Sequence, residues 1–374
     1  MKQIIWITFI VLFLGACNGK EWMLEVSNSS SIDRTSEIVS IDWCTVVEKL
    51  NLSVDETIVI LDYSDVQVPY QLVFEGNEKP QTLIFPADVP ANASVKYKVR
   101  KGTPQTFDAR TFGRYVPERV DDFAWENNRI AFRMYGPALA GAISNGVDVW
   151  LKRTESLIVD KFYYDDLNNK KSYHVDHGDG LDCYDVSWTL GAGGIAPYKD
   201  GKLWLGTPYS TFQVLDNGPL RTTFILNYDS VNIDGKILKQ KLTVSIDANS
   251  QFNKATVVYD GEADNITLAA GIALHGGQGK LVLSAETGSI SYAEDHQESG
   301  WIYVAVILPE GIADIVQDDK HVLALATNRT GQPFTYYFGA GWSKWGFATN
   351  TDWVKHVHGY KQKIKQPLTV AIRH

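Results

Sequence analysis

The sequence predicts an all-β protein, in which a small N-terminal β-sandwich precedes a large antiparallel, supersandwich-like β-sandwich. Short runs that alternate apolar and polar residues recur along the chain, and clusters of Gly, Asn, Asp and Pro separate them. Such alternation is typical of strands with one buried and one exposed face. Between residues 215 and 374 no convincing helical periodicity interrupts the pattern, so few helices are expected there.

The first element along the chain is a signal segment. Lys2 precedes an apolar run over residues 4–14, and two small residues then lead to Cys17. The run is shorter than the roughly 20 residues that cross a bilayer. Residues 1–16 are therefore predicted to be a lipoprotein signal peptide and Cys17 the lipidated residue, which anchors the protein to the cell membrane or outer membrane, facing the periplasm or the cell surface. An ordinary cleaved signal is the alternative.

A small sandwich is predicted to follow a flexible, serine-rich tether over residues 17–36. It occupies residues 37–102, and turn residues at 75–77 and 90–92 separate its strands. Its strand-like runs are residues 57–63, 68–74, 82–85 and 95–99.

The large sandwich is predicted over residues 103–374 and is expected to carry the catalytic site. Its strand-like runs include residues 220–228, 238–246, 254–259, 266–274 and 301–308. His356 and His358 alternate with Val357, which predicts that both lie on one face of a strand and have a structural role.

The composition excludes some classes of partner. The net charge of −9 argues against nucleic acid, and an anionic substrate would need a local cluster of arginines. Apart from Cys17, only Cys44 and Cys183 are present, which is too few for a disulfide framework, so both are expected to be free. Eleven Trp and eighteen Tyr suit sugar stacking, but also suit ordinary strands and cores.

The densest group of chemically active side chains lies at residues 173–184. It contains Tyr173, His174, His177, Asp182 and Tyr184, with glycines between them. This glycine content indicates a loop of unusual backbone geometry, and such loops commonly carry functional sites. The alternative is that Asp–Gly pairs form turns and the histidines are merely solvated.

Two kinds of chemistry are open to this loop. His174, Asp176, His177 and Asp179 are all competent metal ligands, but their spacing matches no established zinc motif. A histidine base with a neighbouring tyrosine acid suits proton transfer near neutral pH. Proton transfer is favoured, and no metal or other cofactor is assigned.

A second cluster holds arginines that could bind an anionic substrate. Five arginines fall within residues 110–133, and guanidinium groups match carboxylate or sulfate oxygens in bidentate geometry. Pairing with the neighbouring carboxylates is the structural alternative for at least half of them. Arg119 and Arg133 are the preferred substrate ligands, with Arg114 as a third.

More distant residues could join the same site. His275 directly follows a strand-like run, where a loop histidine could enter a cleft. Trp342 and Lys344 lie in a glycine-rich aromatic segment, so Trp342 could stack on a sugar ring, although packing at a sheet edge is the commoner role for Trp.

Four strings together resemble a family of exported Bacteroidota proteins associated with polysaccharide-utilisation loci. They are residues 117–127, 132–139, 148–153 and 174–184. One branch that this chain resembles is the oligosaccharide dehydratase of ulvan degradation. The resemblance implies an enzyme that removes water from a non-reducing-end glucuronate or iduronate, which leaves a 4,5-unsaturated uronate.

The chemistry of this elimination suggests roles for the candidates. The C5 hydrogen is acidic because it lies beside the carboxylate, so a cation must neutralise the enolate-like charge, and Arg119 or Arg133 could do so. His177, then His174, is the preferred base.

An acid must also protonate the leaving C4 oxygen. Tyr184 or Tyr173 is suitable, with His275 as a substitute. Asp182 could orient a histidine through its second ring nitrogen.

Two other classes of function remain open. A glycoside hydrolase would need paired carboxylates, for which Asp176, Asp179 or Glu118 could serve. A non-catalytic lipoprotein could capture oligosaccharides through its tryptophans and arginines.

Overall fold

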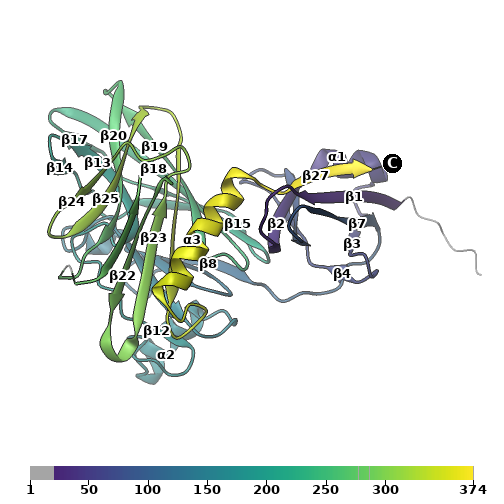
Figure 1. The fold of residues 1–374 in the computed structure, drawn as a ribbon, viewed down its shortest axis with the longest axis horizontal. Coiled ribbons are helices and arrows are strands. Elements are labelled where there is room, and N and C mark those ends of the chain that lie inside the picture. Colours follow the sequence, from purple (N-terminus) through teal and green to yellow (C-terminus); the bar gives the residue numbers. More distant parts are fainter. Residues whose placement is uncertain (1–20, 277, 286, 374) are drawn as a thin grey trace, which may run out of the picture.

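The computed structural model describes residues 21–276, 278–285 and 287–373, and its strands form a small and a large sandwich, which confirms the predicted fold class (Figure 1). The paired strands of both sandwiches run antiparallel.

The small sandwich consists of two sheets and a short helix. The first, the β1 sheet, has the order β27 (Thr369–Arg373), β1 (Glu21–Asn28), β7 (Ala93–Lys101), β3 (Ile58–Leu61) and β4 (Gln67–Val68). The second, the β6 sheet, has the order β2 (Arg34–Asp42), β6 (Thr82–Val89) and β5 (Gln71–Val73). Helix α1 (Trp43–Leu50) follows β2, and its N-terminus is capped by the carboxylate of Asp42. The apolar inner faces of both sheets form one buried core.

The predicted tether is wrong over residues 21–36, because this segment belongs to the small sandwich. Leu24 and Val26 alternate with polar residues along β1 and are fully buried. The serine-rich part forms the turn between β1 and β2, where the amide of Asn28 donates to three main-chain carbonyl groups. Its polarity therefore reflects internal hydrogen bonds rather than solvation.

The C-terminal strand β27 also lies in the small sandwich, although it was assigned to the large one. It pairs with β1 over residues 369–373, so the first and last described segments of the chain lie side by side (Figure 1). The small sandwich is therefore discontinuous in sequence.

The large sandwich is built from three sheets. The β10 sheet has the order β12 (Gly180–Asp182), β11 (Val147–Lys152), β10 (Ala131–Met134), β9 (Asp122–Asn127) and β8 (Thr111–Val116). The β20 sheet has the order β14 (Lys202–Leu203), β13 (Ala192–Lys199), β20 (Asn265–Ala273), β25 (His321–Arg329) and β24 (Asp314–Gln317). The β18 sheet has the order β15 (Thr211–Asn217), β16 (Arg221–Asn227), β18 (Lys236–Asp247), β19 (Phe252–Gly261), β26 (Phe334–Trp342), β23 (Trp301–Ile307), β22 (Ser289–Asp295) and β21 (Lys280–Ser284), and β17 (Val231–Ile233) pairs with β18.

The β10 sheet is buried on both faces. One face contributes Trp125 and Phe132 to the main core, which the inner faces of the other two sheets complete. The opposite face packs Trp150 against helix α2 (Val159–Asn169). Polar side chains on this second face are consequently enclosed.

Helix α3 (Asn350–Lys365) contradicts the expectation that few helices follow residue 215. Thr349 and Asp352 form a capping box at its start, and Trp353 and Val357 pack on the outer face of the β18 sheet. His356 and His358 therefore lie on a helix rather than a strand.

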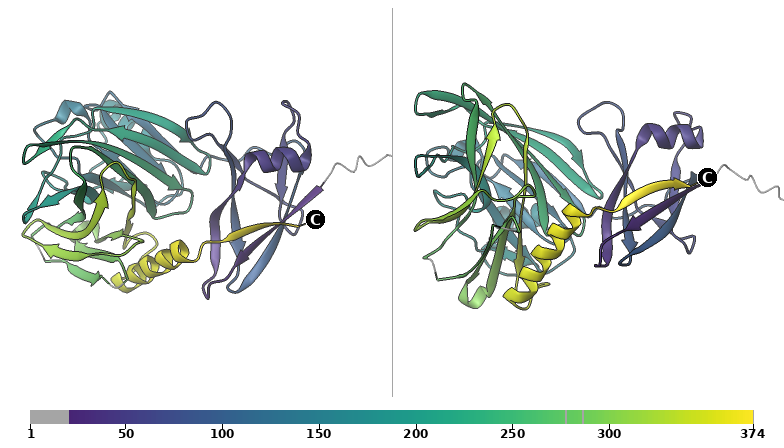
Figure 2. Two further views of the ribbon diagram at one scale, coloured as in Figure 1. Left: turned by 90° about the horizontal axis from the view of Figure 1, so that it is seen from above. Right: turned by 45° about the horizontal axis from the view of Figure 1, so that its top comes forward.

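The two sandwiches are joined by the segment after β7 and by the connection from α3 to β27 (Figure 2). The side chain of Gln71 reinforces the junction, since it accepts from the main-chain amides of Leu220 and Arg221 and donates to the carbonyl of Arg221. Among the described residues, no helix has the length and apolarity that crossing a membrane requires.

Candidate active site

One end of the β10 sheet carries a buried cluster of charges on the face that α2 covers. Arg133 lies opposite Asp148 in the strand register, and its Nη2 atom is 2.6 Å from the carboxylate of Asp148 and 2.8 Å from that of Asp182. The carboxylate of Asp122 lies 3.7 Å from Nη1. Only 2% of the Arg133 side chain is exposed, so the expected substrate contact of Arg133 is corrected to a structural role.

The cluster holds more carboxylates than guanidinium groups, and burial changes their protonation. Burial raises the pKa of Asp122 to about 6, because Arg133 and Arg119 only partly offset the lost hydration. Burial also raises the pKa of Asp148. Although burial disfavours the charge of Arg133, its carboxylate partners outweigh that effect and raise its pKa well above the usual value.

Arg119 lies at the edge of this cluster and reaches solvent. Its Nε atom donates to the hydroxyl oxygen of Tyr173 at 3.2 Å, and Nη1 of Arg133 donates to the same oxygen at 3.3 Å. Arg119 also pairs with Asp122 at 3.5 Å, but 26% of its side chain remains exposed. Of the three arginines preferred from the sequence, Arg119 therefore combines exposure with contact to the loop.

His174 lies beside Tyr173, and one nitrogen of its ring, Nδ1, contacts the main chain. Its Nδ1 atom lies 2.9 Å from the main-chain oxygen of Asp182, which can only accept, so Nδ1 carries the proton. The Nε2 atom is then left with a lone pair, on a side chain that is 57% exposed. The rings of His174 and Tyr173 are 4.6 Å apart. Sequence and structure thus bring Arg119, Tyr173 and His174 together.

The loop between His174 and β12 has the unusual backbone geometry expected from its glycines. Gly180 has a φ of +125°, and a Cβ atom there would lie 1.9 Å from the carbonyl oxygen of Leu151. His177 is exposed, and in the described part of the chain its side chain makes no hydrogen bond or ion pair. The preference for His177 over His174 as a base therefore finds no support in the geometry.

The carboxylates suggested for a hydrolase are all engaged by basic side chains. The ion pairs are Asp176 with Arg153, Asp179 with Lys161, and Glu118 with Arg114. Arg114 also contacts Asp160 at 2.5 Å, so its expected role as a substrate ligand is corrected to pairing with carboxylates beside α2.

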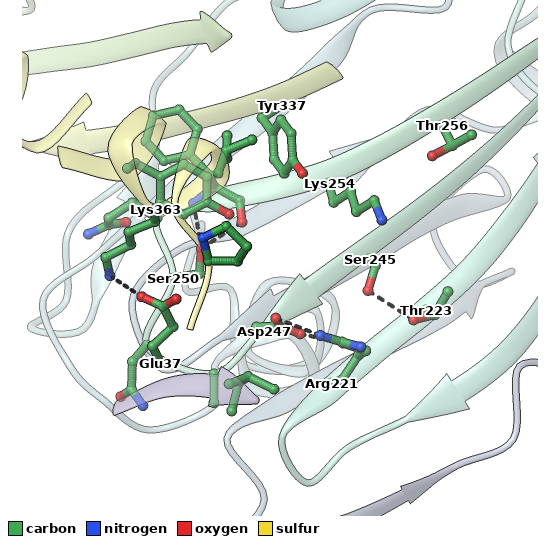
Figure 3. Close-up of a pocket in the computed structure, with 18 of the residues that line it drawn as sticks. Glu37, Arg221, Thr223, Ser245, Asp247, Ser250, Lys254, Thr256, Tyr337 and Lys363 are labelled. Atoms are coloured by element: carbon green, nitrogen blue, oxygen red, sulfur yellow. Dashed lines mark hydrogen bonds and ion pairs between the residues drawn. The ribbon is translucent and has the colours of Figure 1, made fainter. Parts of the chain in front are cut away.

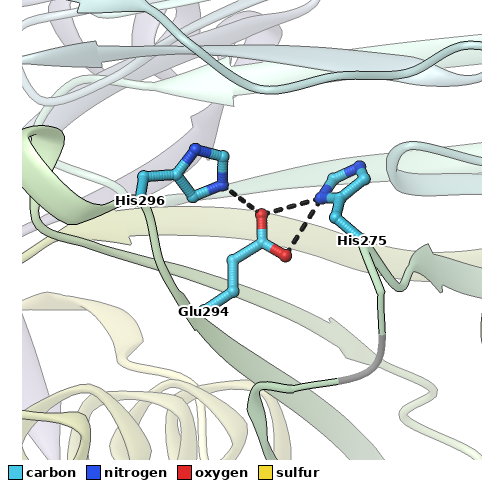
Figure 4. A group of neighbouring side chains, drawn as sticks. All are labelled: His275, Glu294 and His296. Atoms are coloured by element: carbon cyan, nitrogen blue, oxygen red, sulfur yellow. Dashed lines mark hydrogen bonds and ion pairs between the residues drawn. The ribbon is translucent and has the colours of Figure 1, made fainter.

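A second group of titratable side chains lies where β20 and β22 end, and Figure 4 shows its members facing one another. His275, which follows β20, has Nδ1 2.8 Å from Oε1 of Glu294 on β22, and Nε2 of His296 also contacts Oε1. Burial disfavours the charge of His275, but its hydrogen bond with Glu294 outweighs this and raises its pKa. Burial similarly disfavours the Glu294 carboxylate, but its bonds with the two histidines lower its pKa.

Glu294 and His296 were missed in the sequence. They are separated by one residue at the end of a strand-like run, a spacing that places two side chains on one face. Their partner His275 follows β20, a strand of another sheet, so only the packing of the two sheets brings it to them.

Residues 182–185 connect the two groups. Asp182 contacts Arg133 and His174, Tyr184 packs edge-on against His275 with ring centroids 4.9 Å apart, and the carbonyl oxygen of Asp185 lies 2.6 Å from Nε2 of His275. Tyr184 is buried, which raises its pKa well above the usual value. The expected association of His275 with the loop is therefore present.

Trp342 and Lys344 differ in whether their side chains are accessible to a substrate. Trp342 is buried and donates its indole N–H to the carbonyl oxygen of Ser299 at 2.6 Å, so it cannot offer its face to a sugar as expected. Lys344 is exposed, with its ammonium group 2.5 Å from the carbonyl oxygen of Glu298.

Cys44 and Cys183 are both free, as predicted, whereas Cys17 lies outside the described residues.

A separate cavity of about 720 Å³ lies between the outer face of the β18 sheet, α3 and the small sandwich (Figure 3). Arg221 and Asp247 form an ion pair in it, and Lys363 pairs with Glu37 across it. His356, Tyr337 and Tyr360 also line it, but His356 packs on Phe252 and Trp353 rather than on a tyrosine, unlike His174 beside Tyr173.

A protein-family model and a relative each match most or all of the chain. The model of the family described as "Domain of unknown function (DUF4861)" matches residues 26–370. An "Uncharacterized protein P7" from Formosa agariphila is 27% identical over the full length of both chains.

Solved structures with a similar fold come from Enterococcus faecalis. One is described as a protein in glycosyl hydrolase family 38 (TM-score 0.59, 10% identity, 96% of this chain and 48% of that one). The other is described as an α-mannosidase (TM-score 0.59, 9% identity, 95% of this chain and 46% of that one). The chain thus spans about half the length of either protein, and at this identity the likeness concerns the fold.

Proposed function

This chain belongs to the DUF4861 domain family, and from that premise we propose that it is a carbohydrate-active dehydratase that removes water from the non-reducing-end uronic acid of oligosaccharides such as ulvan fragments. The observation that carries the proposal is that buried Tyr173 contacts two side chains that reach solvent, Arg119 through its hydroxyl oxygen and His174 through its ring. The fold shared with proteins described as a glycosyl hydrolase and an α-mannosidase supports a sugar substrate.

Arg119 is proposed to bind the uronate carboxylate. Its side chain is exposed in part, and its charge would neutralise the negative charge that builds up when the neighbouring C5–H bond breaks. Buried Arg133 stabilises this arrangement, because it contacts both the Tyr173 hydroxyl and the carboxylate of Asp182.

His174 is proposed to take the C5 proton through Nε2. The main-chain oxygen of Asp182 holds the proton of the ring on Nδ1, which leaves a lone pair on Nε2 of this exposed side chain. Asp182 is thus proposed to position His174, through its main-chain oxygen rather than through its carboxylate.

Tyr173 is proposed to protonate the C4 oxygen. The C5–H and C4–O bonds then break, the C4–C5 double bond forms, and the hydroxyl leaves as water. The two guanidinium N–H groups that reach Tyr173 would stabilise the phenolate. Transfer of the proton from His174 back to Tyr173 restores the enzyme, so the net change is the loss of one water.

Cys17 is proposed to carry a lipid anchor, with the protein facing the periplasm or the cell surface. Strand β1 begins at Glu21, so an anchored Cys17 would hold the small sandwich close to the bilayer. Mass spectrometry of the mature N-terminus tests this: a diacylated or triacylated Cys17 is expected, and an unmodified N-terminus would contradict the anchor.

The dehydratase is tested by incubating the purified protein with glucuronate-ended oligosaccharides and following the ultraviolet absorbance of the conjugated product. Absorbance that rises with wild-type protein, and is lost with Tyr173→Phe, is expected. New reducing ends without absorbance would instead indicate a hydrolase, and binding without any product would favour a capture protein that uses the cavity of Figure 3.

A further inference from the structure

We infer that His275, Glu294 and His296 bind a zinc ion. The inference goes beyond the proposed dehydratase, which uses none of these side chains. One ligand atom of each residue lies within 4.8 Å of the other two, and the residues come from two strand ends that meet in the large sandwich (Figure 4). Ligands of a tetrahedral zinc ion lie about 3.3 Å apart, so small side-chain movements suffice to close the site around the ion.

The set of ligand atoms favours zinc over hard cations. Two imidazole nitrogens and a carboxylate oxygen form a known type of protein zinc site with three ligands, and it leaves a fourth position for water. Calcium and magnesium prefer oxygen ligands, of which only Glu294 offers any here.

His275 has the outer contact that zinc-binding histidines usually have. Its Nε2 atom lies 2.6 Å from the main-chain oxygen of Asp185, an acceptor that keeps the ring proton on Nε2. The Nδ1 atom, which faces Glu294, is then free to donate its lone pair to a metal. Tyr184 packs against the ring and limits its rotation.

Glu294 is also placed as a ligand rather than as a surface ion-pair partner. Its side chain is almost fully buried, and the same Oε1 atom faces both imidazoles. An ion bound between the three groups would take the place of these contacts.

The other metal hypothesis, for residues 174–182, is not supported by the geometry. Asp176 and Asp179 are paired with Arg153 and Lys161, and within the described residues the His275–Glu294–His296 group is where histidine and carboxylate ligands converge.

The test uses the full mature chain, stripped with a chelator and then dialysed against zinc chloride. Retention of about one zinc ion per chain, measured by elemental mass spectrometry, is expected. Glu294→Gln keeps the shape of the side chain but removes its charge, and His296→Gln removes one nitrogen ligand. Each variant should weaken zinc binding by roughly 10- to 100-fold or more, as loss of a ligand does.

Two matched controls make the result specific. His358→Gln changes an exposed histidine of α3, and His174→Gln changes the proposed base, so both should retain zinc like the wild type. Zinc should also raise the melting temperature of the wild type but not of Glu294→Gln. No zinc retention by the wild type, or retention that Glu294→Gln and His296→Gln leave unchanged, would overturn the inference, whereas the dehydratase is judged separately by its product.

Discussion

Asp182 holds His174 through its main chain and Arg133 through its side chain. Its carbonyl oxygen lies 2.9 Å from Nδ1 of His174, and its carboxylate lies 2.8 Å from Nη2 of Arg133. An exposed imidazole on a glycine-rich loop is thereby fixed to a buried cluster on a rigid sheet. Loops held on a rigid scaffold in this way are frequent locations of active sites.

Replacement of Arg119 by Lys is expected to lower kcat on the order of 100-fold while the fold is retained. Lysine keeps the charge but loses the Nε–H that bonds to Tyr173, and a single lost donor to a developing negative charge has an effect of this size. Steady-state kinetics on a uronate-ended oligosaccharide measure it. Arg114→Lys is the matched control, because Arg114 is occupied by Asp160 and Glu118, and equal losses in both variants would speak against a specific role for Arg119.

Glucuronate-ended oligosaccharides are expected to react faster than iduronate-ended ones, on the order of tenfold. The proposed acid and base, Tyr173 and His174, are neighbours with rings 4.6 Å apart, so they approach the sugar from one side. In glucuronate the C5–H and C4–O bonds lie on one face of the ring, whereas in iduronate they lie on opposite faces. Competition between the two substrates, followed by mass spectrometry, decides; a preference for iduronate would contradict the assigned acid–base pair.

Replacement of Arg133 by Met is expected to destabilise the fold by about 3 to 5 kcal/mol, because it leaves buried carboxylates without their partner. Arg129→Met is the control, since Arg129 pairs with Glu155 at the surface, where such a pair contributes about 0 to 1 kcal/mol. Urea unfolding measures both. A midpoint for Arg133→Met that equals that of the control would show that the cluster does not stabilise the sheet.

Folding stability is expected to fall as the pH decreases from about 6.5 to about 4, in part because of His356. Burial, with a contribution from Lys363, lowers the pKa of this histidine to about 4. The folded state therefore binds fewer protons than the unfolded state in that range, and stability decreases as the pH falls through it. The shift corresponds to a contribution on the order of 3 kcal/mol.

The test compares His356→Gln with His358→Gln by urea unfolding at several pH values. The first variant should have a shallower dependence on pH between 4 and 6.5, and the second should follow the wild type, because His358 is exposed. A wild-type slope in His356→Gln would contradict the assignment.

The alternating runs predicted most of the large sandwich because alternation is a local property. The run at residues 238–246, for example, lies within β18 (Lys236–Asp247).

Helix α3 was missed although its capping box is present in the sequence. Its apolar positions follow a weak pattern, and the surface on which it packs belongs to the β18 sheet, which is distant in sequence. The tether was misjudged because serine content alone does not reveal internal hydrogen bonds.

The candidate site could be predicted only where its residues are close together in the sequence. Tyr173, His174 and Asp182 are close in sequence, so their density was visible. That Arg119 is exposed while Arg133 is buried depends on the cover that α2 provides, which no local pattern encodes. The Glu294–His296 pair acquires its significance only when β20 and β22 bring His275 to it.

The most direct test of the central claim is mass spectrometry of a glucuronate-ended oligosaccharide after incubation with wild-type protein, His174→Ala and His177→Ala. Both histidines are exposed on one loop, but only His174 is held by Asp182 beside Tyr173. A product lighter by one water is expected with the wild type and with His177→Ala, and not with His174→Ala. Undiminished product with His174→Ala, or no loss of water with the wild type, would contradict the proposed elimination.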